Sequence, residues 1–263
     1  MIGITGVPFD EFSSFMRGPA KAPQFIRQAF HSNSANYFTE NRIDLKNNTQ
    51  WQDAGDMKLP QGKAAIREIE REMDQLLAKY DKVLALGGDH SVSYPLVKAT
   101  AKKFGKLTIL HLDAHGDLYD EFDGNKYSHA CPFARIMEEG LASRLVQVGI
   151  RTMTQHQYEQ VQRFGVEVIE MRDWKPEMEF SFEGPVYISL DLDAVDPAFA
   201  PGISHHEPGG FTSREIISLI QKVKGNIVGA DLVELNPDRD HGGITAMLAA
   251  KLFKELLELL LKK

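Results

Sequence analysis

The sequence is nearly devoid of cysteine: Cys131 is the only one in 263 residues. This excludes an internal disulfide and fits a reducing compartment, where we expect Cys131 to be a small buried thiol. No apolar run approaches the roughly 18 residues of a membrane span, and MIGITGVPF at the N-terminus resembles neither a secretory signal nor a transit peptide. We therefore expect a soluble, cytoplasmic protein without membrane contact.

Clusters of basic residues with interleaved aromatic residues are also lacking. Lys and Arg number 30 against 37 Asp and Glu, a formal net charge of −7, which argues against a nucleic-acid partner. No GxGxxG pattern follows the first apolar run, so a dinucleotide site is not indicated. Without repeats, linkers or low-complexity tracts, residues 1–263 are expected to form a single domain.

Seven apolar runs rich in β-branched residues alternate with seven amphipathic segments. This alternation predicts one three-layer α/β/α domain with a mainly parallel sheet covered by helices on both faces. Residues 33–58 lack clear periodicity and are expected to be irregular. Thr212 and Glu215 form the pattern of a helix-capping box. The expected strands are 2–7, 82–86, 107–112, 145–150, 166–170, 186–192 and 226–233. The expected helices are 22–30, 63–79, 94–104, 131–140, 154–164, 212–222 and 243–261.

Acidic and histidine side chains gather where three expected strands end. Run 107–112 leads into Asp113, His115 and Asp117, which share one side of an extended chain. Run 186–190 leads into Asp191 and Asp193, and run 82–86 into a Gly-Gly turn with His90. Ligands of parallel sheets bind outside the carboxyl ends of the strands, so these side chains are expected to converge.

Four carboxylates and two imidazoles in one crevice would repel or be poorly solvated without cations. Oxygen ligands with some imidazole and no thiolate suit Mn²⁺ or a similar hard divalent ion. Six ligands exceed what one catalytic ion with an open position needs, whereas bridging carboxylates can hold two ions. The pattern therefore predicts a two-metal hydrolase site.

Three motifs carry a family resemblance: GGDHS at 87–91, DAHGD at 113–117 and SLDLDAVDPAFAPG at 189–202. With these three motifs in this order, the chain resembles the ureohydrolases, the family of arginases and agmatinases. DAGD at 53–56, GPAKAPQFIR from Gly18 and DLVELNP at 231–237 extend the resemblance over nearly the whole chain. The stretch EFDGNKYSHACPFARIMEEG and the later PGISHHEPGG look most like plant-type arginases and their bacterial relatives.

The resemblance implies two Mn²⁺ ions per subunit and an assembly of three or six copies. Asp113 and Asp191 would bridge the ions. A hydroxide between them would attack the guanidinium carbon and release urea. The implied ligands are His90, Asp113, His115, Asp117, Asp191 and Asp193.

Further roles come from the same resemblance. Asp117 would also relay the hydroxide proton, His129 would shuttle protons, and Glu234 would orient the guanidinium through paired hydrogen bonds. Without the resemblance, His129 reads as a surface loop residue. Asn125, in the loop before His129, is the candidate contact for an amino-acid head group.

The resemblance implies a small guanidino compound as substrate, and the metal motifs do not choose among such compounds. L-arginine, hydrolysed to L-ornithine and urea, is the first interpretation because the 122–139 loop resembles plant-type arginases. Agmatine is the alternative, because Leu118 and Tyr119 replace the polar residues of animal-type arginases. Other guanidino acids, formimidoylglutamate and a catalytically silent binding protein stay open. His205 and His206 receive no catalytic role.

Overall fold

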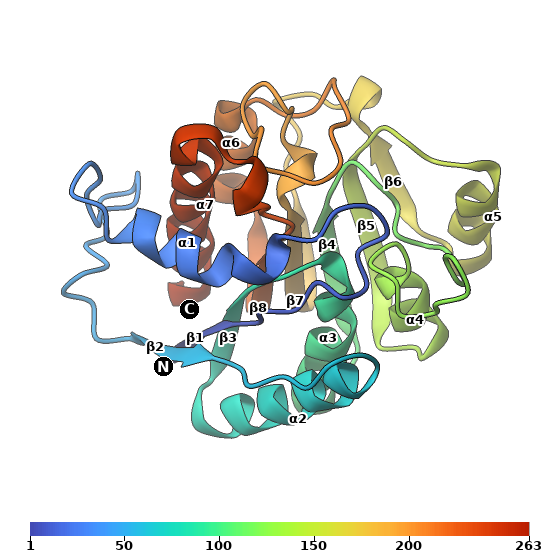
Figure 1. The fold of residues 1–263 in the computed structure, drawn as a ribbon, viewed down its shortest axis with the longest axis horizontal. Coiled ribbons are helices and arrows are strands. Elements are labelled where there is room, and N and C mark those ends of the chain that lie inside the picture. The colour runs from blue at the N-terminus through green and yellow to red at the C-terminus, as the bar shows by residue number, and fades with distance from the viewer. Residues whose placement is uncertain (263) are drawn as a thin grey trace.

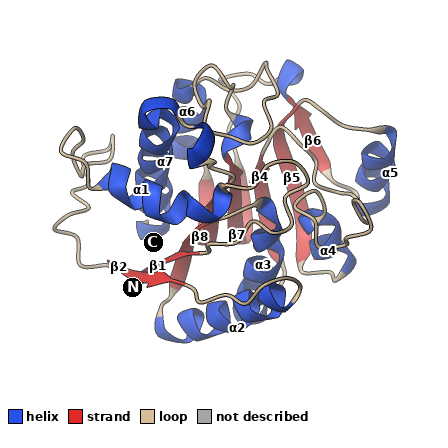
Figure 2. Cartoon of the chain, in the orientation of Figure 1, coloured by secondary structure: helices blue, strands red, loops and turns tan. Residues whose placement is uncertain are grey.

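The computed structural model describes residues 1–262, which form an eight-stranded, wholly parallel sheet in the order β2-β1-β3-β8-β7-β4-β5-β6. Figure 2 shows the strands in the centre with helices on either side. The strands are β1 (Ile2–Gly6), β2 (Trp51–Asp56), β3 (Lys82–Leu86), β4 (Leu107–Leu112), β5 (Ala142–Ile150), β6 (Glu167–Glu170), β7 (Ser181–Asp191) and β8 (Lys224–Val233).

The helices form the two outer layers of an α/β/α sandwich (Figure 1). One apolar cluster joins α1, α6 and α7 to the sheet, and a second joins α2, α3, α4 and α5 to its other face. The predicted three-layer class is confirmed. The helices are α1 (Ala22–Phe30), α2 (Ala64–Lys79), α3 (Ser93–Phe104), α4 (Pro132–Glu138), α5 (Gln155–Phe164), α6 (Ser213–Lys222) and α7 (Ile244–Leu261).

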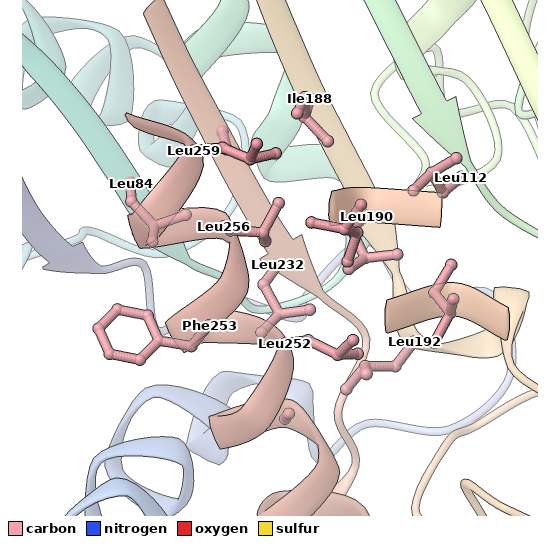
Figure 3. Close-up of a cluster of buried hydrophobic side chains, with 14 of the residues drawn as sticks. Leu84, Leu112, Ile188, Leu190, Leu192, Leu232, Leu252, Phe253, Leu256 and Leu259 are labelled. Carbon is pink, nitrogen blue, oxygen red and sulfur yellow. The ribbon is translucent and has the colours of Figure 1, made fainter. Parts of the chain in front are cut away.

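Helix α7 packs its leucine-rich side over the middle of the sheet. Leu252 and Leu256 are fully buried beside Leu190 of β7 and Leu232 of β8 (Figure 3). Both faces of these strands are covered, so their side chains are apolar on each side rather than on alternate positions. Within residues 1–262, no helix combines the length and apolar character needed to cross a membrane.

Segment 33–58, expected to be irregular, contains strand β2 at the sheet edge. Its side chains are mostly exposed and its sequence, WQDAGD, carries no apolar alternation. The strand forms because β1 supplies hydrogen-bonding partners and because Arg27 of α1 binds Asp53 and Asp56. Tertiary pairing thus overrides a weak local preference.

The other predicted elements are confirmed to within a few residues, including the capping box in which the Thr212 side chain accepts from Glu215 N. Strands β3, β8, β7 and β4 are consecutive neighbours in the sheet although they are distant in sequence. Their carboxyl ends therefore bring together residues from four parts of the chain. This edge is where the predicted site residues lie.

Candidate metal centre

Asp113, at the end of β4, faces two histidines with its two carboxylate oxygens. Oδ2 lies 3.1 Å from Nδ1 of His90, and Oδ1 lies 3.4 Å from Nδ1 of His115. The carboxyl group is fully buried. Asp113 therefore belongs to two groups of metal-ligating side chains at once.

The first group surrounds His90, which follows β3. Its Nδ1 lies 3.1 Å from an oxygen of each of three carboxylates: Asp113, Asp117 and Asp191. About 3 Å is the separation expected between neighbouring ligands of an ion whose bonds are about 2.1 Å long. His90 Nδ1 is buried and has no hydrogen-bond partner among the described residues. An orphaned nitrogen facing three carboxylates is a donor set that fits a divalent cation.

The second group pairs His115 with Asp193, whose Oδ2 lies 2.9 Å from His115 Nδ1. Asp193 Oδ1 accepts a hydrogen bond from Ala114 N at 3.1 Å, which fixes the carboxylate in place. One oxygen of Asp191 accepts from Asp193 N at 2.7 Å, and its other oxygen faces His90. The second group therefore consists of His115, Asp193 and Asp113. The bridging role of Asp191 stays a prediction.

The electrostatics of the two groups call for positive charge. Burial, together with the neighbouring Asp193 and Asp113, raises the pKa of Asp191 well above its usual value. Burial lowers the pKa of His90, but the three carboxylates 3.1 Å from its Nδ1 outweigh burial and raise that pKa well above 6.5. A cation would neutralise these carboxylates without a proton.

A second layer of hydrogen bonds orients the candidate ligands. His90 Nε2 lies 2.9 Å from Ser189 Oγ, which donates to Asp231 Oδ1 at 2.6 Å, and Tyr187 also donates to Asp231. Ring orientation by such partners is usual for metal-binding histidines. The sequence analysis assigned these side chains no role, although Ser189 and Asp231 begin two of the motifs that carry the family resemblance.

His111 was also missed. Its Nε2 lies 2.7 Å from Asp113 Oδ2, and its ring stacks on Phe133. A signal was available, since His111 precedes Asp113 by two positions in the same strand and so shares its face.

Glu234 and His129, from two distant loops, contact each other beside the first group. His129 Nδ1 lies 2.8 Å from Glu234 Oε1, and the same oxygen accepts from His90 N at 2.9 Å. Among residues 1–262 no donor contacts Oε2. Asp117 and Glu234 have positive φ angles of 49° and 66°, a costly backbone for residues with a side chain that is typical of functional sites.

A cavity of about 620 Å³ opens next to these residues. His115 and His205 line it, and Asp123, Glu207 and Arg239 give its wall charges of both signs. The His205 ring lies 5.8 Å from that of His115 and 5.3 Å from that of His129, while His206 lines the wall and contacts Arg239.

Asn125 does not line this cavity. Its Oδ1 accepts from Tyr127 N at 3.0 Å, which makes it part of a local turn. Phe122 and Asp123 of the same loop do line the cavity. A substrate contact by Asn125 stays a prediction.

Residues 1–258 match the family model described as "Arginase family". The chain belongs to the arginase family. It is 47% identical to "Arginase 1, mitochondrial" of Arabidopsis thaliana, across 96% of this chain and 79% of that protein. It is 34% identical to the "Agmatinase" of Bacillus anthracis, across 97% and 90%. The solved structure "Arginase from Medicago truncatula" superposes with a TM-score of 0.94 at 44% identity, covering 98% of this chain and 87% of that one.

These arginase relatives correct the predicted cytoplasmic location. The Arabidopsis protein is named mitochondrial, which points to an organelle rather than the cytoplasm. The expectation was wrong because a single cysteine indicates only a reducing compartment, and an organelle interior meets that condition as well as the cytosol does.

Proposed function

We propose that this arginase-family chain hydrolyses the guanidinium group of L-arginine to L-ornithine and urea at a centre of two divalent cations. The observation that carries the proposal is Asp113, which faces His90 with one oxygen and His115 with the other, while Glu234, in contact with His129, accepts from the backbone N of His90.

The proposed ligands are the six predicted ones, and the proposed metal is Mn²⁺, one ion in each group. The fit rests on the orphaned His90 Nδ1 and on a donor set of carboxylate oxygens and imidazoles without thiolate. When bound, two such cations lower the pKa of water and so supply a nucleophile near neutral pH.

The protein's own side chains would bind and orient the substrate. Glu234 directs both of its observed hydrogen bonds to Oε1, which leaves Oε2 to accept from a guanidinium N–H. Because a carboxylate is a strong acceptor for charged donors, this contact would orient the guanidinium, through one oxygen rather than the predicted pair, since Oε1 is occupied by His90 N and His129. Asp117, whose Oδ2 lies 3.1 Å from His90 Nδ1, would hold the proton of the attacking water.

His129 would hold the proton that the leaving nitrogen needs. Burial favours the neutral ring, but the charge and hydrogen bond of Glu234 outweigh it and raise the pKa of His129 to about 9. The imidazolium is therefore available at neutral pH, and the proton can pass to the departing amine.

The cavity wall favours L-arginine over agmatine. An amino-acid head group carries an ammonium and a carboxylate, and the wall offers Asp123 and Glu207 for the first and Arg239 for the second. Agmatine has no carboxylate, so Arg239 would gain nothing from it. Agmatine to putrescine and urea is the alternative reaction.

Two further properties belong to this proposal. Residues 1–263 would form one ureohydrolase domain, and family membership supports an assembly of three or six copies. Light scattering on a sizing column would measure the mass of the assembly. A monomer would contradict the proposed assembly without affecting the proposed chemistry.

The deciding experiment is urea release from L-arginine and agmatine at equal concentration, with Mn²⁺-loaded and chelated protein. We expect chelator-sensitive urea from arginine, and Glu234→Gln should lower its rate at least about 100-fold. Asp238→Asn is the matched control, because Asp238 follows the same strand but only pairs with exposed Lys21.

Each other outcome has a definite meaning. Urea from agmatine alone would overturn the substrate while keeping the reaction. No urea from either, with binding retained, would indicate a silent member of the family.

A further inference from the structure

The loop between β1 and α1 is fixed against the turn that carries His90. Asp89 N donates to Phe9 O at 2.9 Å, and Phe12 N donates to Asp89 Oδ2 at 3.0 Å. A Cβ at Gly88 would lie 1.7 Å from the Phe9 carbonyl oxygen, so only glycine permits this approach. The loop therefore has a set position over the site.

Ser14, in this loop, makes two contacts with one nitrogen of His129. Its backbone N lies 3.1 Å and its Oγ 2.7 Å from His129 Nε2. The other ring nitrogen faces Glu234, and His129 N itself donates to Phe12 O at 3.1 Å. The same loop thus holds both the backbone and the ring of His129, across 115 residues of sequence.

These contacts select one form of the neutral ring. A backbone amide can only donate, so Nε2 accepts and the proton sits on Nδ1, from which it is donated to Glu234. The Ser14 hydroxyl can donate to the neutral ring, and it can also accept from Nε2–H once the ring is protonated. The Ser14 hydroxyl can therefore hydrogen-bond to Nε2 in both the neutral and the protonated form of the His129 ring.

We propose that Ser14 is a positioning residue for His129. It holds the neutral ring with its proton on Nδ1, and its hydroxyl supplies the acceptor that the imidazolium needs at Nε2. The consequence for turnover rests on the proposed function, in which His129 gives a proton to the leaving nitrogen.

The other charged and titratable groups near His129 are not altered by removal of the Ser14 hydroxyl. Glu234, Asp89 and Asp117 favour the imidazolium, and the His205 ring lies 5.3 Å away. They come from the ends of β8, β3 and β4 and from the loop after β7. A change in the pKa of His129 on substitution of Ser14 can therefore be attributed to the Ser14 hydroxyl.

The first test is Ser14→Ala. The backbone N–H still points at Nε2 and favours the neutral ring, while the imidazolium loses its acceptor. We expect the pKa of His129 to fall, and the alkaline limb of kcat to move down by roughly one pH unit with KM unchanged. Ser14→Thr keeps both contacts and should restore the profile.

Ser13→Ala is the matched control. Ser13 lies in the same loop, but its hydroxyl faces Asp89 Oδ2 at 3.2 Å rather than His129. We expect this variant to lose some thermal stability and to move the alkaline limb less than Ser14→Ala does, because Ser13 reaches His129 only through the Asp89 charge. An equal shift in both variants would mean that loop disorder, not the Ser14 hydroxyl, moves the profile, and would overturn the proposal.

The second test needs no turnover. In metal-free protein labelled with ¹⁵N-histidine, NMR distinguishes a protonated from a bare ring nitrogen, and the His129 signals are identified by their loss in His129→Asn. We expect a protonated Nδ1 and a bare Nε2 in the neutral ring, and a lower titration midpoint in Ser14→Ala.

A protonated Nε2 in the neutral wild-type ring, or an unchanged midpoint in Ser14→Ala, would overturn the proposal. If Ser14→Ala fails to fold, the wild-type spectrum still decides the tautomer. A protein that releases no urea would refute the proposed function but leave the NMR result decisive for Ser14.

Discussion

At the scale of single residues, Arg239 combines a structural contact with a free charge at the cavity wall. Its NH1 donates to Ser204 O at 2.9 Å, and NH2 lies 3.1 Å from His206 Nδ1. The guanidinium is thus held in a fixed direction while it lines the cavity. A carboxylate entering the cavity would meet a preorganised partner.

Replacing this charge should change the choice of substrate. Arg239→Met is expected to raise KM for L-arginine about tenfold or more, because a charge-assisted hydrogen bond is worth about 1.5–3 kcal/mol, and to leave any activity on agmatine unchanged. Steady-state kinetics with both substrates measure the effect. Arg239→Lys, which keeps the charge, should have a KM for L-arginine between those of the wild type and Arg239→Met. An equal loss on both substrates would show that Arg239 only supports the loop.

Cys131 is the second residue with a testable chemical state. It is fully buried at the start of α4, and burial with nearby acidic groups raises the pKa of its thiol to about 12. The thiolate is the reactive form, so the native protein should resist iodoacetamide at pH 8 and react only after denaturation. Mass spectrometry of the Cys131 peptide checks this, and rapid modification of the folded protein would contradict the buried position.

At the scale of elements, Glu40 ties the loop before β2 to two helices. Its carboxylate accepts from both terminal nitrogens of Arg214 in α6 at 2.8 Å and lies 3.3 Å from Lys251 Nζ in α7. The hydrogen bond to Arg214 is the main cause that lowers the pKa of Glu40 to about 2. The carboxylate is partly exposed, so the contribution is that of a surface network, about 1 kcal/mol.

This contribution has a predictable pH dependence. A lowered folded-state pKa stabilises the fold above the ordinary value near 4.5, and the stabilisation is lost as pH falls toward 2. Glu40→Gln should therefore be less stable than wild type at pH 7, and the difference should shrink below pH 4.5. Urea unfolding at several pH values measures it. Glu68→Gln is the comparison variant: Glu68 pairs with Arg71 within α2 and its pKa is also lowered, so its pH dependence should have the same sign but a smaller size than that of the Glu40 network. A difference independent of pH would rule out the ion pair as its source.

The elements also show what local sequence can predict. Helix α6 is recognisable because its apolar side recurs with helical period and Thr212 caps it, and both features lie within a dozen residues. Strand β2 is not recognisable, since it depends on pairing with β1 and on Arg27.

The site divides in the same way. Asp113 and His115 follow a buried strand, so their position marks them without further knowledge. Ser14 has no such mark, and the DLVELNP motif that Asp231 begins does not reveal its role, because both roles arise from contacts with residues about 115 and 42 positions away. Glu234 and His129 were identified through family resemblance, and only the fold brings them within hydrogen-bonding distance.

At the scale of the whole molecule, the candidate centre exists only when the central sheet is complete. Its residues follow β3, β4, β7 and β8, which are neighbours in the sheet but span positions 82–234 of the chain. An unfolded chain would scatter the ligands. Metal binding should therefore be coupled to global folding rather than to one element.

The coupling predicts a metal-dependent melting temperature. A cation that binds only the folded state stabilises it by about 2.7 kcal/mol at 100 times its Kd, which corresponds to a rise in Tm of roughly 5–10 °C for a chain of this size. Scanning calorimetry of chelated protein with increasing Mn²⁺ measures the rise. Asp113→Asn should abolish most of it, because Asp113 faces both His90 and His115, whereas Asp238→Asn should retain it. A Tm that does not respond to Mn²⁺ would mean that the clustered carboxylates are neutralised by protons instead, and the pKa of Asp191, raised by burial and by its neighbours, would then be the property to measure.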